Sequence, residues 1–150
     1  MLERFVMLGT PLTRAPNPLQ RWYVGLAWLA CVFSTQADPL LRCQFEVNAE
    51  TYQHDFAPVT NPYTVQSVDL GGRFRFKAVV LGDATQVQLI DLYASYQTRR
   101  QPMILQHAQF VAPLAQPQPA PDALTGRVAL YSPFLGKELK YACALHEVAP

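Results

Sequence analysis

Large apolar residues recur at every second position in two segments near the two ends of residues 38–150, with strict apolar–polar alternation in the first. The apolar positions are Leu41, Cys43, Phe45 and Val47 in the first segment, and Leu139, Tyr141, Cys143 and Leu145 in the second. Side chains alternate between the two faces of a β-strand, so each segment predicts a strand with one face in a core. Both segments place a cysteine on the core-facing side.

Further segments between these two predict strands bounded by turn residues. They are residues 63–70, 73–79, 87–96, 103–111 and 127–131. The stretch 87–96 (VQLIDLYASY) is apolar in both phases, which is typical of a central strand covered on both sides or of a strand containing a bulge. Gly82 and Asp83 precede it and mark the turn of a hairpin.

Residues 38–150 show no helical periodicity over eleven or more residues. About seven short strands separated by turns predict an all-β fold, which we interpret as a single antiparallel β-sandwich, with a small β-barrel as the alternative. A proline-rich break covers residues 112–123 (APLAQPQPAPDA). It predicts an extended path without ladder hydrogen bonds, either as a loop crossing between the sheets or as a docking segment for a partner.

The order of residue types in the N-terminal segment 1–37 is that of a signal peptide. Arg14 and Arg21 precede twelve uncharged residues, 22–33 (WYVGLAWLACVF), and small residues follow. A bilayer-spanning helix needs about 20 apolar residues, so this run is short for a membrane span. We therefore expect export, with cleavage after Ala37.

Cleavage there leaves residues 38–150 as a β-sandwich domain that is periplasmic or secreted. Two alternatives stay open, a short uncleaved membrane anchor and a buried N-terminal helix. Lipidation of Cys31 is a third, although Trp28 stands where the bacterial lipoprotein pattern has leucine.

Two cysteines remain after removal of the signal segment, Cys43 and Cys143. Two cysteines in an exported domain predict a disulfide, because the compartment is oxidising. A bond closing a loop of this length contributes about 4.7 kcal/mol in the chain-entropy model, and measured values are nearer 2–4 kcal/mol. Two buried free thiols are the alternative.

Charge is nearly balanced in residues 38–150, with nine Lys or Arg and ten Asp or Glu. A domain of net charge −1 has no global attraction to phosphate backbones or anionic lipid, so nucleic acid is not an expected partner. We expect instead an envelope protein, a glycan or a lipid head group. Membrane contact is expected only if the N-terminal segment is uncleaved or Cys31 is lipidated.

No catalytic or cofactor motif occurs, since GxSxG, HExxH and a phosphate-binding glycine loop are all missing from the sequence. We therefore expect no enzymatic activity and no cofactor. A small hydrolase built on Ser67, Ser95 or Ser132 with a histidine is a distant alternative. Asp91 lies among apolar neighbours, and we expect it to be partly buried and hydrogen-bonded at a bulge.

A copper carrier is the closer alternative, because exported copper proteins use histidine and methionine ligands. The candidate ligands are His54, Met103, His107 and His146. Met103 and His107 share a strand face but lie about 13 Å apart along the strand, which is too far for one ion. We interpret the histidines as surface residues and expect no metal site.

The speculative ligand site is a cationic stripe of Arg73, Arg75 and Lys77, with Arg99 and Arg100 as possible additions. Alternate cations along one strand are about 7 Å apart and match an anionic partner, although we favour a solvated sheet face or an edge strand protected by charge as their explanation. Several aromatic residues exceed the core-facing positions and mark either a binding surface or a larger core. The leading hypothesis is a non-enzymatic binding or cell-envelope accessory domain.

Overall fold

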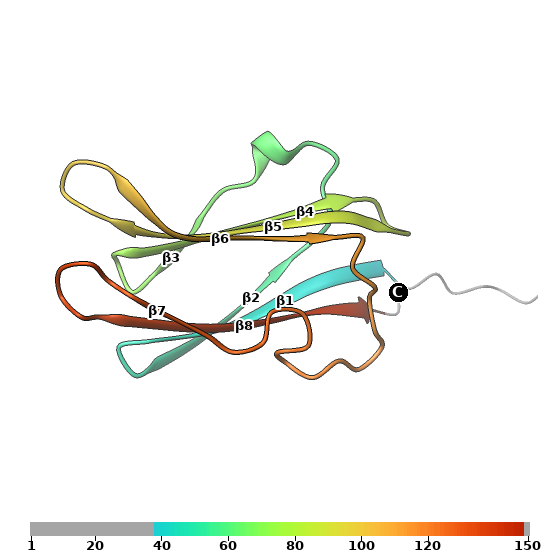
Figure 1. The fold of residues 1–150 in the computed structure, drawn as a ribbon. Coiled ribbons are helices and arrows are strands. Elements are labelled where there is room, and N and C mark those ends of the chain that lie inside the picture. Colours follow the sequence, from blue (N-terminus) through green and yellow to red (C-terminus); the bar gives the residue numbers. More distant parts are fainter. Residues whose placement is uncertain (1–37, 149–150) are drawn as a thin grey trace, which may run out of the picture. The chain divides into compact units, whose positions relative to one another are not determined.

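Two four-stranded antiparallel sheets face each other in residues 38–148, the part of the chain that the computed structural model describes (Figure 1). The first sheet has the order β2-β1-β8-β7, with β1 at Asp38–Val47, β2 at Glu50–Phe56, β7 at Val128–Tyr131 and β8 at Glu138–Val148. The second has the order β3-β4-β5-β6, with β3 at Val68–Leu70, β4 at Phe74–Gly82, β5 at Val87–Gln97 and β6 at Pro102–Val111. The sheets are not closed into a barrel, so the predicted β-sandwich is confirmed.

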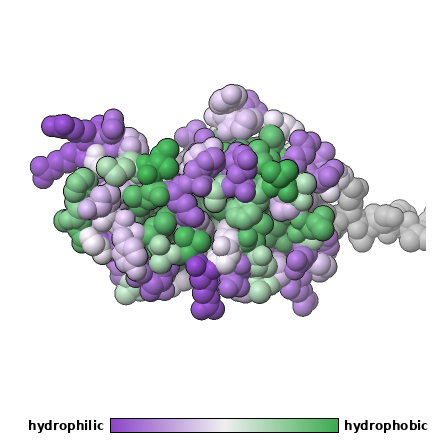
Figure 2. Space-filling view, in the orientation of Figure 1, coloured by the Kyte–Doolittle hydropathy of each residue, from purple (hydrophilic) through white to green (hydrophobic). Residues whose placement is uncertain are grey.

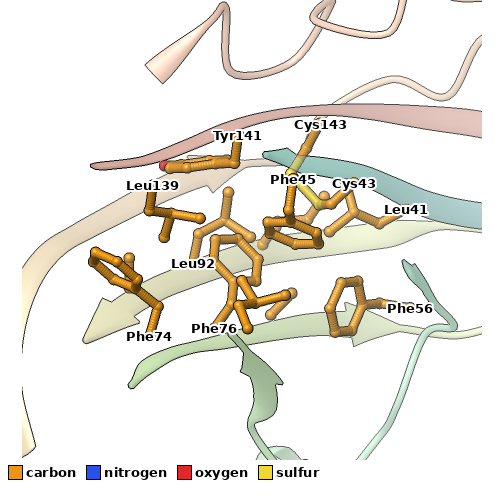
Figure 3. Close-up of a cluster of buried hydrophobic side chains, with 14 of the residues drawn as sticks. Leu41, Cys43, Phe45, Phe56, Phe74, Phe76, Leu92, Leu139, Tyr141 and Cys143 are labelled. Atoms are coloured by element: carbon orange, nitrogen blue, oxygen red, sulfur yellow. A yellow bond between two sulfur atoms is a disulfide. The ribbon is translucent and has the colours of Figure 1, made fainter. Parts of the chain in front are cut away.

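The strand faces that the sequence predicts to be apolar, in the first and last strands, point into the core. All eight apolar positions that define these two faces are buried, as are Phe74, Phe76 and Ala78 of β4. Phe45 of one sheet packs edge-on against Phe76 of the other, with ring centroids 4.8 Å apart (Figure 3). Aromatic and branched side chains from both sheets therefore fill the space between them.

The predicted disulfide between Cys43 and Cys143 is present and fully buried (Figure 3). The two cysteines face each other in the antiparallel register of β1 and β8, and their Cα atoms are 4.1 Å apart. The bond thus joins the first and last strands within one sheet. A structural disulfide indicates an oxidising location outside the cytoplasm.

Eight strands are present where we predicted about seven. The missing one is β2 (ETYQHDF), an edge strand in which Phe56 is buried, Tyr52 is half-buried and His54 stands between them, so its apolar phase is weak in the sequence. The predicted strand 63–70 was mostly wrong. Pro62–Thr64 forms a turn of 3-10 helix capped by Asn61, and only the last three residues of the prediction form a strand, β3.

A β-bulge explains part of the mixed apolar phase of β5, because it puts Val87 out of phase with the later core residues, whereas Leu89 and Tyr93 are half-buried on the outer face. Leu81 of β4 pairs with Leu89 and Gly82 pairs with Val87, so Gln88 is an extra residue on β5. One extra residue reverses the face to which the following side chains point. The predicted hairpin of β4 and β5 and the predicted bulge are both confirmed.

The proline-rich segment crosses from β6 of one sheet to β7 of the other, as predicted for a loop. The expectation that it makes no ladder hydrogen bonds was wrong. Gln116 forms a parallel bridge with His146, through its N–H to the Leu145 carbonyl at 3.1 Å and its carbonyl to the Glu147 N–H at 2.9 Å. The loop therefore covers the edge of β8 beyond the end of short β7.

Both ends of the described chain lie at one end of the sandwich, because Asp38 pairs with Val148. The hairpin loops β5–β6 and β7–β8 lie at the opposite end, on the left in Figure 1. Within residues 38–148, no helix is long and apolar enough to cross a bilayer. The predicted signal segment and Cys31 lie outside the described residues.

Candidate functional site

A cleft of about 660 Å³ opens between the β5–β6 loop of one sheet and the β7–β8 loop of the other. We call it the tip cleft. Its lining includes three arginines and three apolar side chains, namely Arg73, Arg99, Arg100, Met103, Phe134 and Leu135. Its volume lies within the range of about 300–1,000 Å³ found for small-molecule sites.

The β5–β6 loop presents two neighbouring arginines on a turn held by Thr98. The Thr98 hydroxyl donates to the Gln101 carbonyl at 2.6 Å and accepts from the backbone N–H of Arg100 and Gln101 at 3.2 and 3.1 Å. A threonine side chain that bonds its own turn replaces ladder hydrogen bonds where the strands separate. Arg99 and Arg100 consequently project from an ordered turn into solvent.

Ser132 closes the β7–β8 loop in a similar way. Its backbone N–H donates to the Lys137 carbonyl at 2.7 Å, and its buried hydroxyl accepts from the Lys137 N–H at 3.0 Å. The four residues between them carry Phe134 and Leu135. These two large apolar side chains are 72% and 62% exposed, so this loop displays hydrophobic surface rather than burying it.

Tyr96 is the buried polar group of the tip cleft. Its ring packs edge-on against Phe74, and the residue is 1% exposed. Its hydroxyl has no hydrogen-bond partner, the one such buried side-chain atom among residues 38–148. A buried hydroxyl without a partner costs about 1–3 kcal/mol, and Tyr96 is one of the residues that line the cleft.

The three residues of the cationic stripe predicted from the sequence lie in three different environments. Arg73 lines the tip cleft together with Arg99 and Arg100. Arg75 instead pairs with Asp69 of β3 at 3.0 Å. Lys77 borders a separate depression on the outer face of the second sheet. The tip cleft, rather than the stripe, is where the structure gathers cations.

Positive charge in the tip cleft is not neutralised within residues 38–148. None of its three arginines forms an ion pair there, and no carboxylate lines the cleft. A depression of similar size, about 640 Å³, lies at the opposite end of the domain. It is lined by Asp38 and Asp83 and by no Lys or Arg, so the charge of the domain is unevenly distributed between its ends.

Asp91 lies on the outer face of the second sheet rather than in the core. It is partly buried, as expected, and accepts hydrogen bonds from His107 Nε2 at 3.1 Å and Gln109 Nε2 at 3.0 Å. The His107 ring stacks on Tyr93 with centroids 4.4 Å apart. Among the described residues, no serine, threonine or cysteine hydrogen-bonds to His107, so this pair has no positioned nucleophile.

The predicted bulge was not at Asp91, which pairs regularly with Val79 and Gln109. The three candidate serines also lie apart. Ser132 is buried at the base of the β7–β8 loop, Ser95 lies on β5, and Ser67 precedes β3.

The four candidate metal ligands lie on two different sheets. His54 and His146 belong to the first sheet, where their register partners Cys43 and Leu40 place them on opposite faces. Met103 and His107 belong to β6 of the second sheet. Among residues 38–148, no three His, Cys, Asp or Glu side chains are grouped as metal ligands.

The structure shows which of the additional aromatic residues are buried and which are exposed. Phe56 and Tyr96 are buried in the core, whereas Tyr63, Tyr131 and Phe134 are largely exposed. Sequence reasoning missed Tyr96 and Leu135 as site residues. The order of the strands could have indicated the cleft. Consecutive strands of an up-and-down sandwich run in opposite directions, so every second connecting loop lies at the same end.

Comparison with known proteins gives no match to a family model, to a curated protein or to a solved structure. The tip cleft is therefore interpreted from its own geometry and charge.

Proposed function

We propose that the domain is a non-enzymatic binding module of the periplasm or extracellular space, and that the tip cleft holds an anionic ligand with an apolar part. The observation that carries this proposal is the gathering of three arginines and no carboxylate around a cleft that Tyr96, whose buried hydroxyl has no partner, also lines. A guanidinium group binds phosphate or carboxylate oxygens in bidentate fashion. Apolar side chains beside them would cover the hydrocarbon part of the same ligand.

The disulfide supports the proposed location, since a β-sandwich held by a disulfide suits an oxidising compartment. The disulfide also ties both cysteines into the core, so neither is a free thiol. Binding by charge-assisted hydrogen bonds and apolar contact needs neither a cofactor nor a nucleophile.

Isothermal titration calorimetry of the exported protein with three probes tests the proposal. Decyl phosphate below its micelle concentration has both parts of the expected ligand, inorganic phosphate has only the anion, and decyl maltoside has only the chain. We expect decyl phosphate to bind at least tenfold more tightly than either of the others. Equal affinity for all three probes would overturn the proposal.

Two substitutions locate the binding. Arg73→Gln removes one cation of the cleft and is expected to weaken decyl phosphate binding about tenfold, because a hydrogen bond to a charged group contributes about 1.5–3 kcal/mol. Tyr96→Phe removes the buried hydroxyl, and should weaken binding without lowering the urea midpoint, since that hydroxyl has no protein partner. Lys77→Gln, on the outer sheet face, is the matched control and should bind as the wild type does.

A further inference from the structure

Exposed apolar side chains are concentrated at the tip of the domain. Five of the nine large hydrophobic residues that residues 38–148 expose belong to the ends of β6 and β7 and to the β7–β8 loop. They are Met103, Ile104, Tyr131, Phe134 and Leu135. Figure 2 shows hydrophobic side chains at the left end of the domain, directly beside projecting hydrophilic ones. Met103, Phe134 and Leu135 line the tip cleft, whereas Ile104 and Tyr131 lie on the outer faces of the two sheets. Exposed apolar side chains gathered around one cleft mark an interaction surface.

Cations accompany these apolar residues on the same two loops. Arg99 and Arg100 are exposed on the β5–β6 loop, and Lys137 follows Phe134 and Leu135 on the β7–β8 loop. None of the three forms an ion pair within the described part of the chain. The end of a nearly neutral domain therefore combines local positive charge with hydrophobic surface.

The β7–β8 loop exposes more apolar surface than any other part of the tip cleft. Phe134 and Leu135 line this open cleft and are 72% and 62% exposed, so their side chains are accessible to a partner larger than a single small molecule. A lipid surface would cover them, because apolar side chains enter the headgroup and acyl boundary while neighbouring cations meet the phosphates.

The tip is also clear of the ends of the described chain. Asp38 and Val148 lie at the opposite end of the sandwich, so contact through the tip does not require the N-terminal segment. This is a second route to a membrane, besides the anchor or lipid group considered from the sequence.

We propose that the two loops dock the domain on an anionic lipid surface, with Phe134 and Leu135 inserted at the interface and Arg99 and Arg100 on lipid phosphates. This inference rests on the proposed function, because the anionic amphiphile of the tip cleft is then a membrane lipid. Binding is expected to require both an anionic headgroup and the apolar loop.

Vesicle co-sedimentation tests the docking. The exported protein is mixed with vesicles of phosphatidylcholine, either pure or containing 30 mol% phosphatidylglycerol, and all variants carry the same N-terminal segment. We expect at least tenfold stronger partitioning to the anionic vesicles, weakened by salt because exposed charges are screened. Equal partitioning to both compositions would overturn the inference.

Two double substitutions are each expected to lower partitioning at least tenfold. Phe134→Ser with Leu135→Ser removes the apolar loop, and Arg99→Glu with Arg100→Glu reverses the charge of the other loop. The matched control for the first is Val111→Ser with Leu114→Ser, which removes two exposed apolar residues at the opposite end. The control for the second is Lys77→Glu with Arg127→Glu, which makes the same charge change elsewhere. Tip variants that partition like their controls would contradict the docking.

A tryptophan reporter gives an independent measurement. Both natural tryptophans precede residue 38, so in protein cut after Ala37 the substitution Phe134→Trp introduces the single indole. Its emission should shift to shorter wavelength with anionic vesicles, whereas that of Leu114→Trp should not. No shift for Phe134→Trp would overturn the insertion of this loop.

The experiments distinguish failure of membrane docking from failure of the proposed ligand binding in the tip cleft. Retained binding of monomeric decyl phosphate without vesicle binding would overturn membrane docking and leave the tip cleft as a site for a soluble amphiphile. Loss of both would overturn the proposed function as well.

Discussion

The Tyr141 hydroxyl on β8 donates a 2.8 Å hydrogen bond to the side-chain oxygen of Gln106 on β6, and so connects the two sheets directly. The ring of Tyr141 also packs against Phe76 of the second sheet, with centroids 5.1 Å apart (Figure 3). One side chain thus combines apolar packing in the core with a polar link between the layers.

Removal of this hydroxyl by Tyr141→Phe should destabilise the domain by about 1 kcal/mol, because a partly buried hydrogen bond is lost and the Gln106 oxygen is left without its donor. The urea midpoint measures the effect. Tyr131→Phe is the control, since the Tyr131 hydroxyl bonds Glu138 at an exposed position and its loss should change stability by less than about 0.5 kcal/mol. Equal effects of the two substitutions would contradict the role of Tyr141.

Alkaline pH should act through the same residue. Burial raises the pKa of Tyr141 to about 12 from its ordinary value of 10.0. The folded state retains this proton longer than the unfolded state, so the stabilisation is complete below about pH 10 and is lost as the pH rises toward 12. Urea unfolding between pH 9 and 11.5 should therefore show a steeper loss of stability for the wild type than for Tyr141→Phe. Parallel curves would be inconsistent with a raised pKa.

The disulfide should account for a large share of the stability of so small a domain. Replacement of Cys43 and Cys143 by alanine is expected to cost about 2–4 kcal/mol, since the bond closes a loop with a sequence separation of 100 residues. Urea unfolding with and without reductant measures this cost. The reductant should destabilise the wild type and leave the double variant unchanged, and a wild type indifferent to reductant would refute the prediction.

Acid pH should weaken the pairing of β1 with β2. Arg42 donates two hydrogen bonds of 2.8 Å to the Asp55 carboxylate, and these lower the pKa of Asp55 below its ordinary value of 3.8. The stabilisation is present above pH 3.8 and is lost as the pH falls through the lowered pKa. Both side chains are more than a third exposed, so the pair contributes less than about 1 kcal/mol.

The measurement for this pair is acid unfolding of Asp55→Asn. The variant should be slightly less stable than the wild type at pH 6, and the difference should disappear near pH 2. Asp122→Asn is the control, because its partner Arg127 lies 3.7 Å away and is almost fully exposed. A difference that persists unchanged to pH 2 would count against the pairing.

Much of the fold is determined by the sequence alone, because alternation of apolar residues is a local property that each strand carries by itself. The phases of β1, β4 and β8, the β4–β5 hairpin and the Cys43–Cys143 bond could all be predicted in this way. The strand β2 could not, since an edge strand buries little and needs no apolar phase. Its existence depends on pairing with β1, which lies in the tertiary structure.

The tip cleft exists only in the tertiary structure and could not be predicted from the local sequence pattern. Its residues come from three separate stretches, at position 73, within 96–103 and at 134–135. The sequence places Arg73 and Arg75 together on one strand, yet a neighbouring strand neutralises Arg75 through Asp69 while Arg73 joins Arg99 and Arg100 across a hairpin end. Whether a charge is paired depends on which strands become neighbours, and that choice is made by packing of the whole core rather than by the local pattern that predicts each strand.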